Sequence, residues 1–151
     1  MANAPLRVGH VVFNVTDVAR SVKFYTELVG LQVAARRDDA AFLTCGTQHH
    51  DIALFQVPAG TVPGEAPAVG LNHVALQLPD RAALRARYDM LRERDVPVRT
   101  TEHNVTLSIY FPDPDGNRIE LFCDRYADGL EVMRTKGPMA RPMDIEQLER
   151  L

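Results

Sequence analysis

A repeated motif organises the chain. Residues 8–17 read VGHVVFNVTD, and residues 71–80, which lie 63 positions further on, read LNHVALQLPD. A histidine, a valine and an aspartate recur at identical places in the two stretches, and the same offset places Tyr25 on Tyr88. A duplicated unit constrains the architecture more firmly than local propensity does. The sequence therefore predicts two modules that share one fold.

Each module predicts the element order βαβββ. Residues 9–15 and 72–78 alternate between two faces, which is typical of strands, and an aspartate that can cap a helix follows each stretch. Apolar residues then recur at helical spacing, up to Gly30 in the first module and through Leu91 in the second. Beyond each helix come three short segments of strand character, residues 31–36, 40–45 and 51–57, then residues 98–101, 107–111 and 118–123.

The two modules are separated by a segment that favours a linker. Residues 59–70, AGTVPGEAPAVG, contain small residues, proline and glycine. Module one is therefore expected over residues 7–58 and module two over residues 71–124, together forming a single domain at residues 1–124. Within module two, residues 113–117, DPDGN, favour a hairpin turn between the last two strands.

The remaining residues, 125–151, show little pattern beyond a short helix at 144–151. We expect them to form a C-terminal tail. Such a tail can cover a reaction site and exclude water from it, and the alternatives are a disordered tail or a contact with a second copy.

The composition excludes several classes of partner. The 17 basic and 20 acidic residues give a formal charge of −3 without a long run of like charge, so neither nucleic acid nor a membrane surface is an expected partner. No apolar run is long enough to span a bilayer, and the first ten residues lack the pattern of a signal peptide, so a cytoplasmic location is expected. Cys45 and Cys123 lie outside any CxxC pattern and are expected to be reduced, buried thiols.

Three segments carry a family resemblance: HVVFNVTDVARSVKFYTELVGL in module one, then NHVALQL and YFPDPDGNRIELF in module two. With the paired βαβββ order, they resemble the vicinal oxygen chelate superfamily over residues 7–124. That superfamily includes glyoxalase I, fosfomycin-resistance thiol transferases, bleomycin-sequestering proteins and type I extradiol dioxygenases. The resemblance implies an α+β fold in which two tandem βαβββ modules form a cupped mixed sheet around a divalent metal site.

The resemblance also implies the metal ligands, which come from the first and last strands of each module. His10 and His73 occupy the first strands, Glu120 the last strand of module two, and Ala53 the matching place in module one. Two imidazoles and one carboxylate with open positions suit non-heme Fe(II), ahead of Mn(II). Because glyoxalase I uses four ligands, Ala53 argues against that activity.

The remaining histidines separate the candidate reactions. By resemblance to the extradiol dioxygenases, His50, His103 and Tyr110 would surround a catechol-type substrate, although strict alternation from Ala53 points His49 inward instead of His50. Imidazoles suit the loss and return of protons near neutral pH, and Tyr110 could hydrogen-bond and orient the substrate.

The sequence therefore favours an extradiol ring-cleavage dioxygenase that takes a small aromatic diol and dioxygen, with homodimerisation implied by the resemblance alone. Most type I extradiol enzymes have four modules, so this chain resembles the small single-domain members. The alternatives are a fosfomycin-type metal-dependent thiol transferase and a metal-free drug-binding resistance protein of the same fold.

Overall fold

The structure, a computed structural model, describes residues 5–62 and 69–151, which divide into two compact units. Unit 1 extends to Ala68 and also includes Pro114–Gly116. Unit 2 comprises Val69–Asp113 and Asn117–Leu151. The two units correspond closely to the two halves of the sequence repeat, and each is described by itself below.

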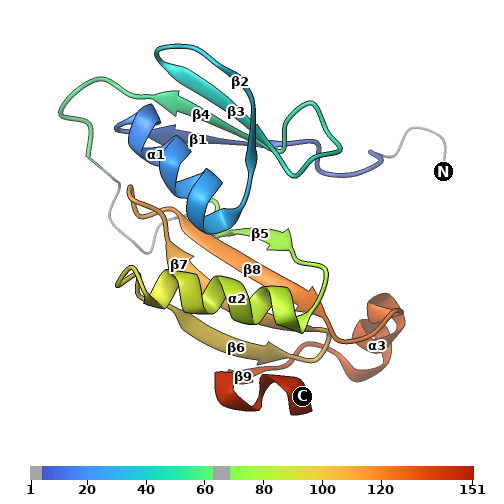
Figure 1. Ribbon diagram of the computed structural model, residues 1–151. Coiled ribbons are helices and arrows are strands. Elements are labelled where there is room, and N and C mark those ends of the chain that lie inside the picture. The colour runs from blue at the N-terminus through green and yellow to red at the C-terminus, as the bar shows by residue number, and fades with distance from the viewer. Residues whose placement is uncertain (1–4, 63–68) are drawn as a thin grey trace. The chain divides into compact units, whose positions relative to one another are not determined.

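Within the described part of unit 1, one four-stranded sheet is built from β1 (Val11–Val15), β2 (Gln32–Arg36), β3 (Ala40–Thr44) and β4 (Ile52–Gln56). The spatial order is β1-β4-β3-β2 (Figure 1). The first strand runs parallel to β4, whereas the other two pairs are antiparallel. A parallel pair needs a crossover connection, which the helix after β1 supplies.

Asp17 starts that helix, as the sequence predicts. Its side chain accepts a hydrogen bond from the Arg20 backbone N–H at 3.0 Å. The helix α1 (Val18–Phe24) continues as a turn of π-helix, η1 (Tyr25–Val29), and ends at Gly30, whose φ of 94° is left-handed. The sequence predicts one regular helix up to Gly30. The π turn departs from that prediction, and it buries Tyr25 together with its last two residues.

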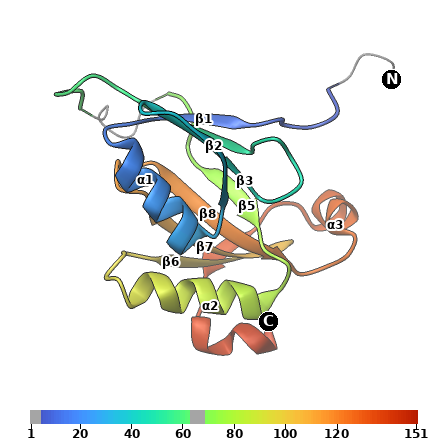
Figure 2. The ribbon, with the colours of Figure 1, turned by 45° about the horizontal axis from the view of Figure 1, so that its top comes forward.

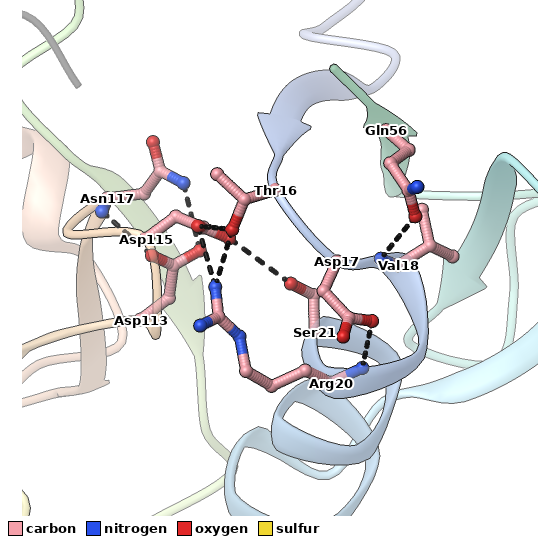
Figure 3. A network of polar contacts seen from close by, with 9 residues as sticks. All are labelled: Thr16, Asp17, Val18, Arg20, Ser21, Gln56, Asp113, Asp115 and Asn117. Carbon is pink, nitrogen blue, oxygen red and sulfur yellow. Dashed lines mark hydrogen bonds and ion pairs between the residues drawn. The ribbon is translucent and has the colours of Figure 1, made fainter. Parts of the chain in front are cut away.

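The turn tip Pro114–Gly116 belongs to unit 1, where Asp115 meets the start of α1 (Figure 3). The Asp115 carboxylate accepts a hydrogen bond from Thr16 Oγ1 at 2.5 Å and pairs with the Arg20 guanidinium at 2.7 Å. Burial raises the pKa of Asp115, but the hydrogen bonds from Thr16 and Arg20 outweigh burial, and the net pKa lies below the ordinary value.

Within the described part of unit 2, a five-stranded sheet has the order β5-β8-β7-β6-β9. Its strands are β5 (Val74–Gln77), β6 (Arg99–His103), β7 (Thr106–Pro112), β8 (Arg118–Asp124) and β9 (Ala140–Pro142). The parallel pair β5 and β8 repeats the β1 and β4 pair of unit 1, so both modules have the predicted βαβββ core. The α+β prediction, with two sheets, is confirmed.

The helix α2 (Arg81–Arg92) packs its apolar stripe on the sheet of unit 2. Asp80 caps it by accepting a hydrogen bond from the Ala83 backbone N–H at 2.8 Å. Leu84 and Leu91, two turns apart on one face, are fully buried. In Figure 2 the 3₁₀-helix η2 (Ile145–Arg150) lies beside α2, which it contacts.

The predicted hairpin turn is confirmed. The Asp113 backbone N–H donates to the Asn117 carbonyl at 2.8 Å, and the Asp113 side chain accepts a hydrogen bond from the Asn117 backbone N–H, also at 2.8 Å. Gly116 has a φ of 85°, a left-handed conformation that glycine adopts without a steric penalty.

The C-terminal segment, residues 125–151, has more structure than the sequence indicates. It contains α3 (Gly129–Lys136), β9 and η2, of which the sequence predicts only the last. Met143, Ile145 and Leu148 are buried, so the segment adds to the core of unit 2. A strand of three exposed residues has no period that a sequence pattern can reveal.

Two smaller expectations differ from the structure. The first strand of each module starts two residues later than predicted, so His10 and His73 lie immediately before β1 and β5. Cys123 is buried as expected, whereas the prediction is wrong for Cys45, which is exposed in the loop after β3. No helix in residues 5–62 and 69–151 is long and apolar enough to cross a membrane.

Candidate functional site

Glu120 and His73 are in direct polar contact in unit 2. Glu120 lies in the middle of β8, where its side chain is only 8% exposed, and its Oε2 lies 2.9 Å from His73 Nε2. The register aligns Glu120 with Ala75 on one neighbouring strand and with Tyr110 on the other. A carboxylate in such a strand is costly to bury without a partner of opposite charge or a ligand.

Asn72 fixes the orientation of the His73 ring. Its Oδ1 lies 2.9 Å from His73 Nδ1 and 3.1 Å from an Arg118 guanidinium nitrogen. Because a guanidinium can only donate, the Asn72 atom between them is the accepting oxygen. The His73 Nδ1 atom therefore carries a proton, and Nε2 faces Glu120. Histidine ligands of metals commonly donate their other N–H to an oxygen in this way.

The distance between His73 Nε2 and Glu120 Oε2 suits two ligand atoms of one metal ion. A neutral His73 presents a lone pair at Nε2, so a positive charge, either a proton or a metal ion, is needed between Nε2 and Oε2. Two ligand atoms, each about 2.1 Å from one octahedral ion, lie about 3 Å apart, close to the observed separation. Over the residues that the structure describes, neither unit by itself gathers three His, Cys, Asp or Glu side chains able to hold a metal. A three-ligand set therefore needs a donor beyond this pair.

Tyr110 and His103 lie next to the pair. The Tyr110 hydroxyl is 3.0 Å from His103 Nε2, and the Tyr110 ring meets the His73 ring edge-on at 5.4 Å between centroids. The other nitrogen of His103, Nδ1, is 3.2 Å from the Met139 carbonyl oxygen. Unit 2 thus brings together four predicted site residues, His73, His103, Tyr110 and Glu120.

The surroundings hold Tyr110 in its protonated form. Burial, followed by the hydrogen bond to Glu120 and the negative charge of Glu120, raises the pKa of Tyr110 to about 12. Ser108 and the Arg99 guanidinium, 4.9 Å above the ring, act in the opposite direction but do not outweigh them. At neutral pH Tyr110 is therefore a hydrogen-bond donor and not a phenolate.

His10 lies in a group of imidazoles in unit 1. The His10 and His50 rings are 4.4 Å apart between centroids, and the His49 and His50 Nδ1 atoms are 2.6 Å apart. Two nitrogens at that distance share one proton. Partial desolvation, then the neighbouring His10 and His49, lowers the pKa of His50, while Asp51 opposes the shift. His49 and His50 both belong to this group, but it is His50 whose ring contacts the His10 ring, at an interplanar angle of 43°.

Ala53 occupies the place in unit 1 that Glu120 occupies in unit 2. It is buried in β4 and aligned with Val12 of β1, as Glu120 is aligned with Ala75 of β5. Unit 1 therefore has no carboxylate at this register position, as the alignment of the two modules predicts.

Sequence reasoning did not identify two groups of this site. Asn72 directly precedes His73 in the sequence, and this position next to a candidate ligand is the signal by which Asn72 could have been identified. The Met139 contact uses a backbone carbonyl 36 residues from His103, for which no side-chain signal exists.

The chain belongs to the glyoxalase/bleomycin resistance protein/dioxygenase superfamily, whose family model matches residues 7–121. Among solved structures, it resembles the glyoxylase/bleomycin resistance protein/dioxygenase domain from Frankia sp. EAN1pec. That match has a TM-score of 0.67 at 21% identity and covers 82% of this chain and 96% of the other, which supports the fold.

Curated relatives include enzymes of two kinds. The chain is 36% identical over 123 residues to biphenyl-2,3-diol 1,2-dioxygenase 3 of Rhodococcus globerulus, covering 80% of this chain and 65% of that protein. It is 33% identical over 118 residues to catechol-2,3-dioxygenase of Bacillus subtilis (strain 168), covering 78% and 41%. It is also 30% identical over 133 residues to metallothiol transferase FosB of Staphylococcus epidermidis (strain ATCC 12228 / FDA PCI 1200), covering 86% and 90%. The chain thus spans less than two-thirds of the length of both dioxygenases.

Proposed function

We propose that this protein is an extradiol ring-cleavage dioxygenase that inserts dioxygen into a catechol-type aromatic substrate. The observation that carries the proposal is the group in unit 2 where Tyr110 and His103 lie beside the Glu120 and His73 pair. A diol substrate requires a pair of metal-ligating side chains, a hydrogen-bond donor and an imidazole that can accept a proton, and these groups lie together here. The names of two relatives, a biphenyl-diol and a catechol dioxygenase, support the same substrate class.

The metal in this proposal is Fe(II), with Mn(II) as the second choice, held by His10, His73 and Glu120. Two imidazoles and one carboxylate form the ligand set typical of non-heme Fe(II) oxygenases. When bound, Fe(II) supplies the one-electron chemistry that lets triplet dioxygen react with an aromatic ring. Asn72 would hold the His73 ring in its ligating orientation.

The protein's own groups would manage the protons of the diol. A catechol must lose a proton to bind as a chelating anion, and a neutral imidazole is a suitable acceptor. We assign this work to His50 or to its neighbour His49, and to His103. Because the pKa of Tyr110 is raised, its hydroxyl would keep its proton, and its hydrogen bond to the diol would help to orient the ring.

The second candidate function is a metal-dependent thiol transferase of the fosfomycin type. The FosB relative is matched over 90% of its length, more than either dioxygenase. Such a site needs several cations for an anionic substrate, and it would use Arg99, above the Tyr110 ring, and Arg118, beside Asn72. Histidines and a tyrosine around the pair favour the catechol. A metal-free drug-binding role would leave the buried Glu120 carboxylate without a metal ion beside His73 and Tyr110, which makes it the weakest alternative.

Metal analysis followed by oxygen uptake tests the proposal. The full chain would be reconstituted anaerobically with Fe(II) or Mn(II) and mixed with a small panel of catechols, while oxygen consumption and a new yellow absorbance are recorded. Oxygen uptake with ring-opened product supports the dioxygenase. Metal binding with no uptake, together with consumption of fosfomycin and a thiol, would establish the second candidate instead.

A further inference from the structure

The C-terminal segment lies beyond the family match and forms one edge of the unit 2 sheet. The superfamily match ends at residue 121, whereas β9 pairs antiparallel with β6 and aligns Ala140 with His103 and Arg141 with Glu102. The strand that carries a candidate catalytic histidine therefore has, as its outer neighbour, a strand outside the matched region.

A buried carboxylate fastens this segment to β6. The Glu102 side chain is 4% exposed and accepts hydrogen bonds from Arg125 at 2.9 Å and from two nitrogens of Arg141, each at 2.9 Å. We call these three residues the Glu102 clamp. Arg125 also donates to the His103 backbone carbonyl at 2.9 Å. Charge-assisted bonds with this fork geometry are directional as well as strong, so they fix the place of β9 against β6.

The clamp brings a backbone carbonyl against His103. The Met139 oxygen, one residue before β9, lies 3.2 Å from His103 Nδ1. A carbonyl oxygen can only accept, so this contact requires a proton on Nδ1. In a neutral imidazole, Nε2 is then the acceptor, and the Tyr110 hydroxyl 3.0 Å away donates to it.

The His103 tautomer decides which acceptors are open to the single Tyr110 hydroxyl proton. Two acceptors face the hydroxyl, His103 Nε2 and the Glu120 carboxylate. If Nε2 of a neutral His103 carried the proton instead, it would donate to the phenol oxygen, and the phenol would donate to Glu120. With Nδ1 protonated, Nε2 accepts instead and competes with the Glu120 carboxylate for the phenol proton.

We propose that the C-terminal segment positions His103: the Glu102 clamp holds β9 so that the Met139 carbonyl selects the Nδ1–H tautomer and makes Nε2 the proton acceptor at the site. Glu102 and Arg141 are positioning residues in this proposal, since they act through the backbone of β9. The effect on turnover rests on the proposed dioxygenase function, but the tautomer does not.

Nitrogen-15 NMR of the histidine side chains in the full, metal-free chain tests the tautomer directly. Spectra would be recorded at about pH 8, at which ordinary imidazoles are neutral, and the His103 signals would be assigned from the loss of signals in His103→Gln. The wild-type chain is expected to show a protonated Nδ1 and an unprotonated Nε2. An Nε2–H tautomer in the wild-type chain would overturn the proposal whatever the variants do.

Two variants test the clamp. Arg141→Met removes the charged half that belongs to β9 and is expected to give a mixture of His103 tautomers, whereas Arg141→Lys keeps the charge and should restore part of the Nδ1–H signal. Arg134→Met, an exposed change in α3 of the same segment, is the matched control and should leave the spectrum unchanged. Unchanged His103 signals in a folded Arg141→Met chain would show that the clamp does not set the tautomer.

Turnover separates this proposal from the function on which it rests. In the iron-loaded protein, Arg141→Met should lower kcat about tenfold while KM changes little, because lost orienting contacts commonly cost about 10- to 100-fold. Arg134→Met should match the wild type. Absence of oxygen uptake in the wild-type protein would reject the dioxygenase function and leave the NMR result to decide the tautomer, whereas wild-type kcat in Arg141→Met would reject the positioning role alone.

Discussion

The two modules have the same core, yet they place very different groups at corresponding positions. In unit 1, His10 is exposed and its ring lies against the His50 ring, and the matching place in the last strand is Ala53. In unit 2, His73 is held between Asn72 and a buried Glu120, and a fifth strand flanks β6. Duplication supplied one scaffold twice. The difference teaches that one backbone scaffold can carry different side chains at corresponding positions, and that here the hydrogen-bonded polar groups lie in the second copy.

The largest expected effect comes from making unit 2 resemble unit 1. Glu120→Ala gives unit 2 an alanine at the position that corresponds to Ala53 of unit 1. The change should remove the metal and abolish turnover. The fold should persist, because the change also deletes a buried charge. Metal content by elemental analysis and circular dichroism are the measurements. Full metal occupancy in this variant would defeat the ligand assignment.

The next effect concerns the imidazole that has no strict counterpart in unit 1. His103→Phe should retain the metal and lower turnover by about 10²-fold or more, the usual scale for a positioned proton-transfer group. Turnover and metal content would be compared across pH with those of the wild type. Equal turnover at every pH would make His103 a packing residue.

A smaller effect is expected at the orienting amide. Asn72→Ala removes the acceptor for His73 Nδ1, and it should weaken metal binding by about tenfold or more. The matched control is Gly9→Ala, because Gly9 is the repeat mate of Asn72 and has open space around an added methyl group. Metal titration of both variants measures the contrast, and equal affinities would remove Asn72 from the site.

The smallest effect is one of stability and belongs to unit 1. Asp115→Asn should lower the unfolding free energy at pH 7 by about 1 kcal/mol, because it removes a charged acceptor of Thr16 and Arg20. The folded-state pKa of Asp115 is lowered, so its contribution is present above the unfolded pKa and is lost as pH falls through the folded value. Denaturant unfolding at several pH values should show the difference between the two proteins shrinking as the pH falls below the ordinary Asp pKa of 3.8. A difference that persists in acid would contradict the ionic explanation.

The sequence predicts the fold well because its signals are local or repeated. Alternation and the capping residues Asp17 and Asp80 lie within a few residues of the elements they predict, and the constant offset shows the same pattern twice. The π turn at Tyr25–Val29 was missed because its apolar spacing fits an ordinary helix equally well. The strand β9 was missed because its pairing comes from distant contacts through Glu102, not from its own three residues.

The candidate site is predictable only in part, for a related reason. Glu120 stands out as a carboxylate in an apolar strand, and the structure places it against His73. The choice between His49 and His50 depends on side-chain rotation, which alternation cannot decide, and the structure places both in one group. A backbone carbonyl such as that of Met139 is present at every residue, so composition carries no information about it.

The position of Met139 in the sequence also has a consequence for folding during synthesis. His103 leaves the ribosome 36 residues before the carbonyl that faces its Nδ1. At about 5 to 20 residues per second, the growing chain spends about 2 to 7 s with β6 made and its outer neighbour β9 not yet made. During that interval β6 is an unpaired edge strand. The β6 edges of two newly made chains can therefore pair with each other. The last strand to be synthesised thus completes the sheet and closes its most exposed side in a single event.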